Sequence, residues 1–371
     1  MKIGILTMHK VLNYGSALQA YALQHYIRSL GHDAELIDYI FPNGNRKARL
    51  TFKQRLTYPI KNLLSGKLRK KRRFQEFYKK YFVCTDKRFN SPEELSNAQF
   101  DYDILMTGSD QVWNPKHIKD DYSFFLPFAS EGIKKVSYAS SFSTAEIPEE
   151  LKPVYREFLD SYSAVSVREK SGIKIVKELV DKDAEMVCDP TLLLSKDEWS
   201  ELIKDKPNPI GQPYILAYIL RYAYDPYPEI NRIIDAVQNE LGLHLAILDG
   251  SLSDMKRKNA SVIKNAGPLE FLNLVKNASF IITTSFHGTA FALNFGIPFY
   301  SVIKDRSGFD TRMIDLLEIS DNLEHAVFLN NIENIHINAV KDEKDESLNK
   351  FKCLSHKYLN NILDKTILNE L

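Results

Sequence analysis

The feature that most constrains the fold is an alternation of strands and helices that occurs twice along the chain. In the first half, an apolar run at residues 2–8 precedes an amphipathic helical pattern at 16–30, and a second strand pattern follows at 33–39. The helical segment has apolar residues at intervals of three and four, and Gly31 directly after it is a typical stop signal. Consecutive strands joined by a helix run parallel, so the pattern predicts a parallel sheet covered by helices.

The alternation continues through both halves of the chain, with a break between them. Further strand patterns lie at 102–107, 134–140, 163–169, 214–220, 243–249, 280–285 and 299–303, and helical patterns at 148–161, 171–180, 228–242, 268–278 and 288–296. Asp189-Pro190 and three prolines at 207–213 disfavour a continuing element at the break. We expect an α/β fold of two Rossmann-like lobes with parallel sheets, at 1–195 and 196–345, and a C-terminal helix at 346–371 that can cross back to the first lobe.

Composition and charge exclude several classes of function. A chain of 371 residues with 44% hydrophobic and 26% charged residues is long enough for two cores, and its net charge of +1 argues against a nucleic-acid binder. Cys84, Cys188 and Cys353 lie far apart, which argues against a thiolate zinc site and favours a reducing compartment. No apolar run suits a signal peptide or approaches the roughly 20 residues of a membrane helix. We therefore expect a cytoplasmic protein without a built-in metal site.

One segment departs from this balanced charge. Residues 46–73 hold twelve Lys or Arg and no Asp or Glu. The segment is either a solvated helical insertion or a surface attracted to anionic lipid head groups or a phosphorylated acceptor. The second interpretation predicts peripheral contact with the inner face of a membrane.

Ligands of doubly wound sheets bind beyond the carboxyl ends of the strands, so the segments that leave the strands are the candidate sites. The segment "SFHGTA" at 285–290 is the most informative, because a helical pattern starts directly after the strand. Amides near Gly288 and Thr289 at a helix start would favour an anion, above all a phosphate, and His287 would lie beside it as a proton donor. The alternative is a packed histidine in a tight turn. The chain has neither G-x-G-x-x-G nor G-x-x-x-x-G-K-[ST], so dinucleotide and P-loop sites lack support.

Polar residues leave two strands of the first half. Arg168 could hold a phosphate or carboxylate in a cleft between the lobes, or pair with Glu169 or Asp160 at the surface. Asp110 could act as a base and Gln111 could recognise a hydroxyl, whereas Asp110 could also simply cap the next turn.

Five segments together resemble the polysaccharide pyruvyl transferase family. They are "NYGSALQAYAL" at 13–23, "GSDQVWN" at 108–114, "VSVREKSG" at 165–172, "DPTLLL" at 189–194 and "TSFHGTAFALNFGIPF" at 284–299. The resemblance implies two lobes of the glycosyltransferase-B type, and transfer of the enolpyruvyl carbons of phosphoenolpyruvate to a sugar as a ketal. It places His287 near the donor and assigns Arg168 to the donor's phosphate or carboxylate. Many members have an arginine where this chain has Ser285.

The resemblance and the residue chemistry together give a predicted site. His287 and Asp110 are the predicted catalytic acid and base. The predicted donor-binding residues are Arg168, Ser285, Gly288, Thr289 and Arg312, with Lys304 and Arg306 as further cations that could replace the missing arginine. The predicted acceptor-binding residues, across the cleft, are Asn13, Tyr14, Ser16, Gln19 and Gln111, whereas Gln24 is predicted to be structural.

Phosphoenolpyruvate is expected as donor substrate, with no other cofactor and no metal, and the acceptor as a sugar or lipid-linked oligosaccharide. The lobe at 1–195 is expected to bind the acceptor and the lobe at 196–345 the donor. Two alternatives remain open: a nucleotide-sugar glycosyltransferase of the same fold, or a non-catalytic member of the family.

Overall fold

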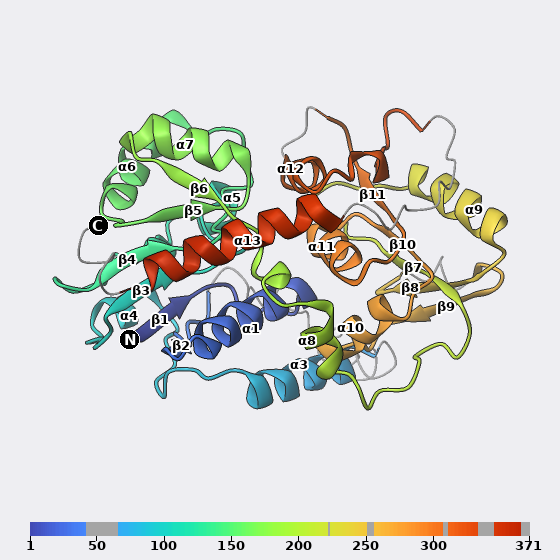
Figure 1. The fold of residues 1–371 in the computed structure, drawn as a ribbon, viewed down its shortest axis with the longest axis horizontal. Coiled ribbons are helices and arrows are strands. Elements are labelled where there is room, and N and C mark those ends of the chain that lie inside the picture. Colours follow the sequence, from blue (N-terminus) through green and yellow to red (C-terminus); the bar gives the residue numbers. More distant parts are fainter. Residues whose placement is uncertain (42–65, 222, 251–255, 307–310, 333–344, 365–371) are drawn as a thin grey trace, which may run out of the picture.

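The first half of the chain forms a parallel sheet, as the alternation predicts (Figure 1). The computed structural model describes residues 1–41, 66–221, 223–250, 256–306, 311–332 and 345–364. The sheet has the order β2-β1-β3-β4 and is formed by β1 (Lys2–Leu6), β2 (Asp33–Leu36), β3 (Ile104–Thr107) and β4 (Lys134–Ser137). Strands β5 (Val165–Val167) and β6 (Ala184–Met186) pair with each other, and isolated bridges from Val136 to Ala164 and from Ser140 to Val167 join them to the edge at β4.

The second half forms a six-stranded parallel sheet of order β12-β11-β10-β7-β8-β9. Its strands are β7 (Tyr214–Tyr218), β8 (His244–Leu248), β9 (Ala260–Ile263), β10 (Phe280–Thr283), β11 (Phe299–Ile303) and β12 (Ala326–Phe328). The direction of winding reverses between β7 and β10, as it does between β1 and β3 in the first sheet. Such reversal points are where doubly wound sheets bind ligands.

Helices cover the sheets and connect the lobes. Those from the first half are α1 (Tyr14–Ser29), α3 (Lys67–Tyr81), α4 (Pro92–Ser96), α5 (Pro115–Ile118), α6 (Lys152–Asp160), α7 (Lys170–Val180) and α8 (Lys196–Glu201). Those from the second half are α9 (Glu229–Leu241), α10 (Pro268–Lys276), α11 (Phe286–Phe295), α12 (Thr311–Ile319) and α13 (Asp345–Ile362). Short 3-10 turns lie at Ser123–Phe125, Glu149–Leu151, Pro190–Leu192 and Leu323–His325.

The largest apolar core runs across both lobes rather than staying within one. Helix α1 packs against α10 and α11, and the ring of Tyr14 stacks on Phe271 of α10 with a centroid distance of 4.9 Å. Trp199 of α8 lies edge-on to Phe291 of α11 at 5.2 Å. An apolar contact of this kind favours a fixed arrangement of the two lobes, because each buried aromatic ring stabilises it by roughly 1.5–3 kcal/mol.

Helix α13 crosses from the second lobe to the first, as the sequence allowed (Figure 1). Lys352, near its middle, donates to Asn294 of α11 at 2.7 Å. Further along, the hydroxyl of Ser355 accepts from the amide of Cys188 at 2.8 Å, and the hydroxyl of Tyr358 donates to the carbonyl of Ser137 at 3.1 Å. The helix therefore ties the two sheets together through buried hydrogen bonds.

The structure departs from the predicted elements at several ends. Helix α1 begins at Tyr14, two residues early, because the side chain of Asn13 caps it by accepting from the amide of Ser16. Helix α11 begins at Phe286, so His287 lies inside its first turn and not ahead of it. Three short strands, β6, β9 and β12, and helix α12 have no counterpart among the predicted elements.

Two further findings concern the part of the chain that the structure describes. No helix there is both long and apolar enough to span a bilayer. No group of three or more His, Cys, Asp or Glu side chains is placed there to hold a metal ion.

Candidate active site at the seam between the lobes

Side chains from the carboxyl ends of both sheets meet at the seam between the lobes. Ser16 and Asp110 leave β1 and β3, the two strands at the reversal point of the first sheet, while Arg168 and Asp189 follow β5 and β6. His287 follows β10, at the reversal point of the second sheet, and its Nε2 lies 3.6 Å from Oδ2 of Asp189. The parallel topology therefore brings together residues that are far apart in the sequence.

Asp189 is the centre of this cluster and is fully buried. Its Oδ1 accepts from the amide and hydroxyl of Thr191, at 3.0 and 2.8 Å. Its Oδ2 accepts from the hydroxyl of Ser109 at 3.1 Å and from Nη1 of Arg168 at 2.7 Å. Burial opposes ionisation, but His287, Arg168 and the hydrogen bonds more than offset it, so the pKa of Asp189 lies far below its ordinary value. Asp189 is a carboxylate that fixes the guanidinium of Arg168.

Asp110 has an unusual backbone for its type of residue. Its φ is 79°, in the left-handed region, which Asp enters more readily than most residues but at a cost. The carboxylate accepts from the hydroxyl of Ser16 and, at 2.9 Å, from the amide of Gln111. Burial raises the pKa of Asp110, but His287, Arg168 and these hydrogen bonds outweigh that effect and lower it. A strained, buried carboxylate beside two basic side chains is typical of a functional site.

His287 is buried and touches the first lobe through Gly15. A Cβ added at Gly15 would overlap Nδ1 and Cγ of the imidazole and would lie 2.7 Å from its Cβ. Gly15 lies inside α1 and not in a left-handed turn, so its role is close approach. The absent side chain of Gly15 makes room for the histidine.

Three nitrogens of this cluster are buried with no hydrogen-bonding partner among the described residues. They are Nε and Nη2 of Arg168 and Nε2 of His287. The guanidinium of Arg168 also lies over the ring of Phe286, 4.4 Å from its centroid, and its Nη2 is 4.0 Å from Oδ1 of Asp110. Buried donors without partners are costly, which is why they usually face a ligand or an ordered water molecule. A surface pairing of Arg168 with Glu169 or Asp160 does not occur.

Arg312 joins the site from α12, on the second lobe. It is 4% exposed, and its guanidinium lies 5.9 Å from the ring centroid of Phe286. The hydrogen bonds favour the orientation of Gln111 in which its side-chain oxygen faces Arg312 and accepts from Nη1 and Nη2 at 2.9 and 3.0 Å. In this orientation the amide nitrogen of Gln111 donates to Nδ1 of His117 at 2.9 Å. By contrast, Lys304 and Arg306 are exposed. Of Lys304, Arg306 and Arg312, only Arg312 is buried at the site, where it could replace the positive charge of the arginine that many family members have at the position of Ser285.

The other predicted donor residues hold the start of α11. Ser285 is its N-cap, and its hydroxyl accepts from the amide of Gly288 at 3.3 Å. The hydroxyl of Thr289 approaches that of Ser301 at 2.5 Å, and its amide donates to the carbonyl of Ser285. These two amides therefore have partners within the helix. Anion binding by this turn stays a prediction and would depend on side chains.

Of the predicted acceptor residues, Asn13 lies at the start of α1 and Gln19 lies within the helix. Asn13 is the N-cap described above, and Gln19 is fully buried, donating to the hydroxyl of Thr7 at 3.0 Å and to the carbonyl of Ser16 at 3.1 Å. Gln24 contacts the backbone at Ala34 and Val83, as expected of a structural residue. Of the predicted acceptor residues, the structure places Ser16 and Gln111 at Asp110.

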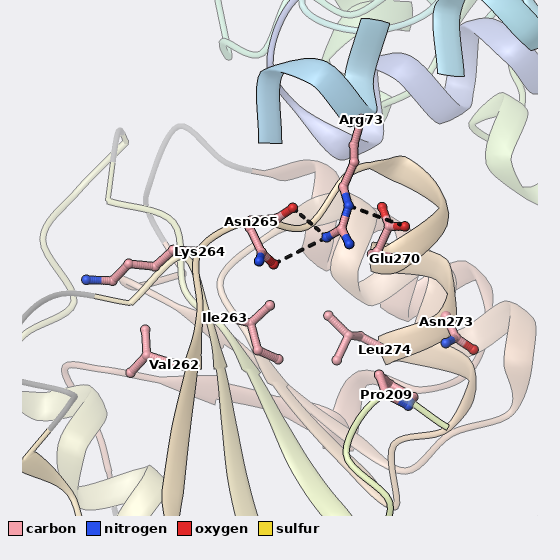
Figure 2. A pocket seen from close by; sticks show the side chains of 9 residues that line it. All are labelled: Arg73, Pro209, Val262, Ile263, Lys264, Asn265, Glu270, Asn273 and Leu274. Carbon is pink, nitrogen blue, oxygen red and sulfur yellow. Dashed lines mark hydrogen bonds and ion pairs between the residues drawn. The ribbon is translucent and has the colours of Figure 1, made fainter. Parts of the chain in front are cut away.

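Tyr14 points to the second lobe, where α3 also makes contact. Its hydroxyl donates to Asp249 at 2.9 Å, and Lys70 of α3 pairs with the same carboxylate at 2.6 Å. Arg73 of α3 donates to the carbonyl of Asn265 at 2.7 Å and lies 3.7 Å from Glu270, above a cavity of about 330 Å³ (Figure 2). Part of the basic segment thus joins the lobes, which the sequence did not predict.

Sequence reasoning missed two buried carboxyl groups of the site. Asp189 lies in "DPTLLL", which the sequence analysis used as a break and as one segment of the family resemblance, without assigning Asp189 a role. Glu169 accepts through Oε1 from the hydroxyl of Ser141 and the amides of residues 142 and 143. Burial raises the pKa of Glu169 despite the opposing charges of Arg168 and Arg312. Glu169 therefore anchors the loop after β4 close to Arg168 and Arg312.

The two parallel sheets and the polar seam between them define a two-lobed α/β protein of the glycosyltransferase-B type. The chain belongs to the polysaccharide pyruvyl transferase family, whose model matches residues 13–305. A search of curated proteins finds no match.

Two solved structures show the same fold at low identity. One is a protein described as a UDP-N-acetylglucosamine 2-epimerase from Listeria monocytogenes, 9% identical with a TM-score of 0.53, over 97% of this chain and 89% of that chain. The other is UDP-GlcNAc 2-epimerase from Neisseria meningitidis bound to UDP-GlcNAc, 10% identical with a TM-score of 0.51, over 97% of this chain and all of that chain.

Proposed function

We propose that this chain transfers pyruvate from phosphoenolpyruvate to a sugar of a cell-surface polysaccharide precursor, as a ketal on two hydroxyl groups. The observation that carries the proposal is the set of buried, unpartnered nitrogens on Arg168 and His287 at the seam. The nearby carboxylates Asp110 and Asp189 already accept hydrogen bonds from the protein. An anion with a phosphate and a carboxylate would satisfy the remaining donors.

The reaction can be assigned to these side chains. His287 protonates the methylene carbon of phosphoenolpyruvate, which makes C2 electrophilic, and Arg168 and Arg312 stabilise the departing phosphate. Asp110 takes the proton of an attacking hydroxyl, with Ser16 orienting it. In total, two O–H bonds, the bond from C2 to the phosphate oxygen and the π bond of the methylene group break, while two C2–O bonds, one C–H bond and one O–H bond on the released phosphate form. Of the two hydroxyl protons, one balances the new methyl group and the other leaves with phosphate.

Thermal unfolding with candidate donors tests the proposal. Phosphoenolpyruvate at about 100 times its Kd should stabilise the fold by about 2.7 kcal/mol, a rise of a few degrees in Tm. UDP- and GDP-sugars should leave Tm unchanged. Stabilisation by the nucleotide sugars alone would indicate a glycosyltransferase, and silence towards all donors would indicate a non-catalytic protein. Phosphate release from phosphoenolpyruvate with candidate glycans then identifies the acceptor.

The exposed face of α3 supports peripheral contact with an anionic membrane. Lys67, Arg69 and Lys71 are exposed on it, with Leu68 47% exposed between them, whereas Lys70 and Arg73 are occupied at the seam. The remaining predicted residues of this surface, 46–65, lie outside the described residues. A lipid-linked acceptor would be held near the site by such a contact.

Vesicle binding tests this contact. Each basic side chain near an anionic surface contributes about 1 kcal/mol, so K67Q/R69Q/K71Q should weaken binding to phosphatidylglycerol vesicles about a hundredfold. K174Q/K177Q, which removes exposed charges from α7, is the matched control and should bind normally. Wild-type binding should also fall steeply with salt. Equal binding of both variants, or binding to neutral phosphatidylcholine vesicles, would refute the contact.

A further inference from the structure

A second hollow lies in the first lobe, beyond the carboxyl ends of β1 and β2. It has a volume of about 190 Å³ and is lined by residues 8–12 and 39–41. This volume is roughly six times the ~30 Å³ share of one water molecule in the liquid. Its walls combine apolar side chains such as Leu12 and Phe41 with the polar His9 and Lys10. An apolar wall beside polar groups suits a ligand with both apolar faces and hydroxyl groups.

His9, which lines this hollow, and the neighbouring Asp38 each bury one polar atom that has no hydrogen-bonding partner among the described residues. These two atoms are Nε2 of His9 and Oδ1 of Asp38. They lie 3.8 Å apart, too far for a hydrogen bond to each other. A hydroxyl oxygen about 2.8 Å from both atoms would complete this pair.

The surrounding contacts hold this pair in place. Nδ1 of His9 is 3.0 Å from the carbonyl of Thr7, which fixes the ring. Oδ2 of Asp38 binds Lys10 at 2.6 Å and Arg88 at 3.1 Å. Burial opposes ionisation of Asp38, but His9, Lys10 and Arg88 outweigh it and lower its pKa, so the carboxylate is a ready acceptor for a hydroxyl proton.

We propose that this hollow is a sugar-binding subsite, in which a ring hydroxyl of the acceptor donates to Asp38 and contacts His9. A free anion is a poorer occupant, because Lys10 and Arg88 are already paired with Asp38 and the unused carboxylate oxygen would repel it. The inference rests on the proposed function for the identity of the sugar as acceptor. The binding of a sugar itself can be tested without the donor.

The hollow is connected to the active site through the chain. Residues 11 and 12 of its wall directly precede Asn13, whose amide donates to the carbonyl of Val11 at 2.8 Å. Asn13 caps α1, and Gly15 two residues later contacts His287. In the proposal, the subsite holds a sugar unit of the acceptor other than the one that receives pyruvate.

Saturation-transfer NMR with simple glycosides tests the subsite. The probes are the methyl pyranosides of glucose, galactose and mannose at millimolar concentration, without phosphoenolpyruvate. At least one should bind the wild type, and His9→Phe should weaken it about tenfold, the effect of losing one hydrogen bond. His25→Phe, which changes an exposed histidine of the same lobe, should bind as the wild type.

A second variant covers the case in which His9→Phe does not fold. Leu12→Trp changes a rim residue that is 54% exposed, and the larger ring should block the hollow without touching the buried pair. Absence of binding of all three glycosides to the wild type, or unaltered binding to both variants, would overturn the proposal and leave the hollow to water. The Tm response to phosphoenolpyruvate should be unchanged in both variants, so failure of the subsite and failure of the proposed function give different results.

Discussion

Replacing His287 by alanine is expected to lower phosphoenolpyruvate-dependent phosphate release about a thousandfold, within the ~10²–10⁴ that a positioned general acid contributes. From the second lobe, the imidazole approaches both Asp189 of the first lobe and Gly15 of α1. The fold should persist, because Asp189 keeps its bonds to Arg168 and Thr191 in the variant. The measurement is phosphate release under saturating donor and acceptor.

The matched control is His244→Asn, at the start of strand β8, where the imidazole contacts Asn259 and Ser261. It should retain full activity. His287→Gln separates two roles of the histidine: a glutamine can still donate a hydrogen bond to a bound anion, but it cannot transfer a proton. We therefore expect His287→Gln to retain a Tm response to phosphoenolpyruvate while losing kcat. Wild-type kcat in His287→Ala or His287→Gln would remove His287 from the reaction.

The fold, and the strand ends at which the candidate site lies, could be predicted from the sequence. Parallel strands place all their carboxyl ends on one edge, so Asp110, Arg168 and His287 could be assigned to that edge from their position after apolar runs. The geometry adds that Arg168 and His287 lie 2.7 and 3.6 Å from Asp189, and that Asp110 lies 4.0 Å from Arg168.

Other features could not be predicted, because they depend on contacts between lobes. The pairing of Lys70 with Asp249 requires knowing where α3 lies on the second lobe, and a run of basic residues gives no such information. Arg312 is a charged residue in the first turn of α12, so its burial beside Phe286 emerges only from packing. Local patterns determine elements, while tertiary packing determines which polar residues are buried.

The apolar core that both lobes share limits how far the lobes can separate. Tyr14, Phe271 and Phe291 belong to one cluster, so the lobes are already joined behind the active site. Opening them fully would expose this surface at a cost of roughly 25 cal/mol per Å². Asp189 and His287 are therefore shielded from water by the packing already present in the structure.

Replacing Gly15 by alanine is the second change with a large expected effect, although it adds only one methyl group. The methyl would overlap the imidazole of His287, so the ring or the start of α1 must move. Overpacking of this kind costs about 1–3 kcal/mol of stability. A displacement of the acid by about 1 Å lowers activity about a hundredfold. Urea unfolding and phosphate release measure the two effects.

A double-mutant cycle with His287→Gly tests whether the clash is the cause. With the side chain of residue 287 removed, the methyl of Gly15→Ala meets none of the three atoms it would otherwise approach. In that background the substitution should become neutral or stabilising by up to about 1 kcal/mol, because alanine favours a helix over glycine. If Gly15→Ala destabilises both backgrounds equally, the contact with His287 is not what requires a glycine. If Gly15→Ala destabilises the wild type but stabilises the His287→Gly variant, the contact between residue 15 of α1 and His287 of α11 is what requires a glycine. The first lobe would then position His287, the proposed acid of the second lobe.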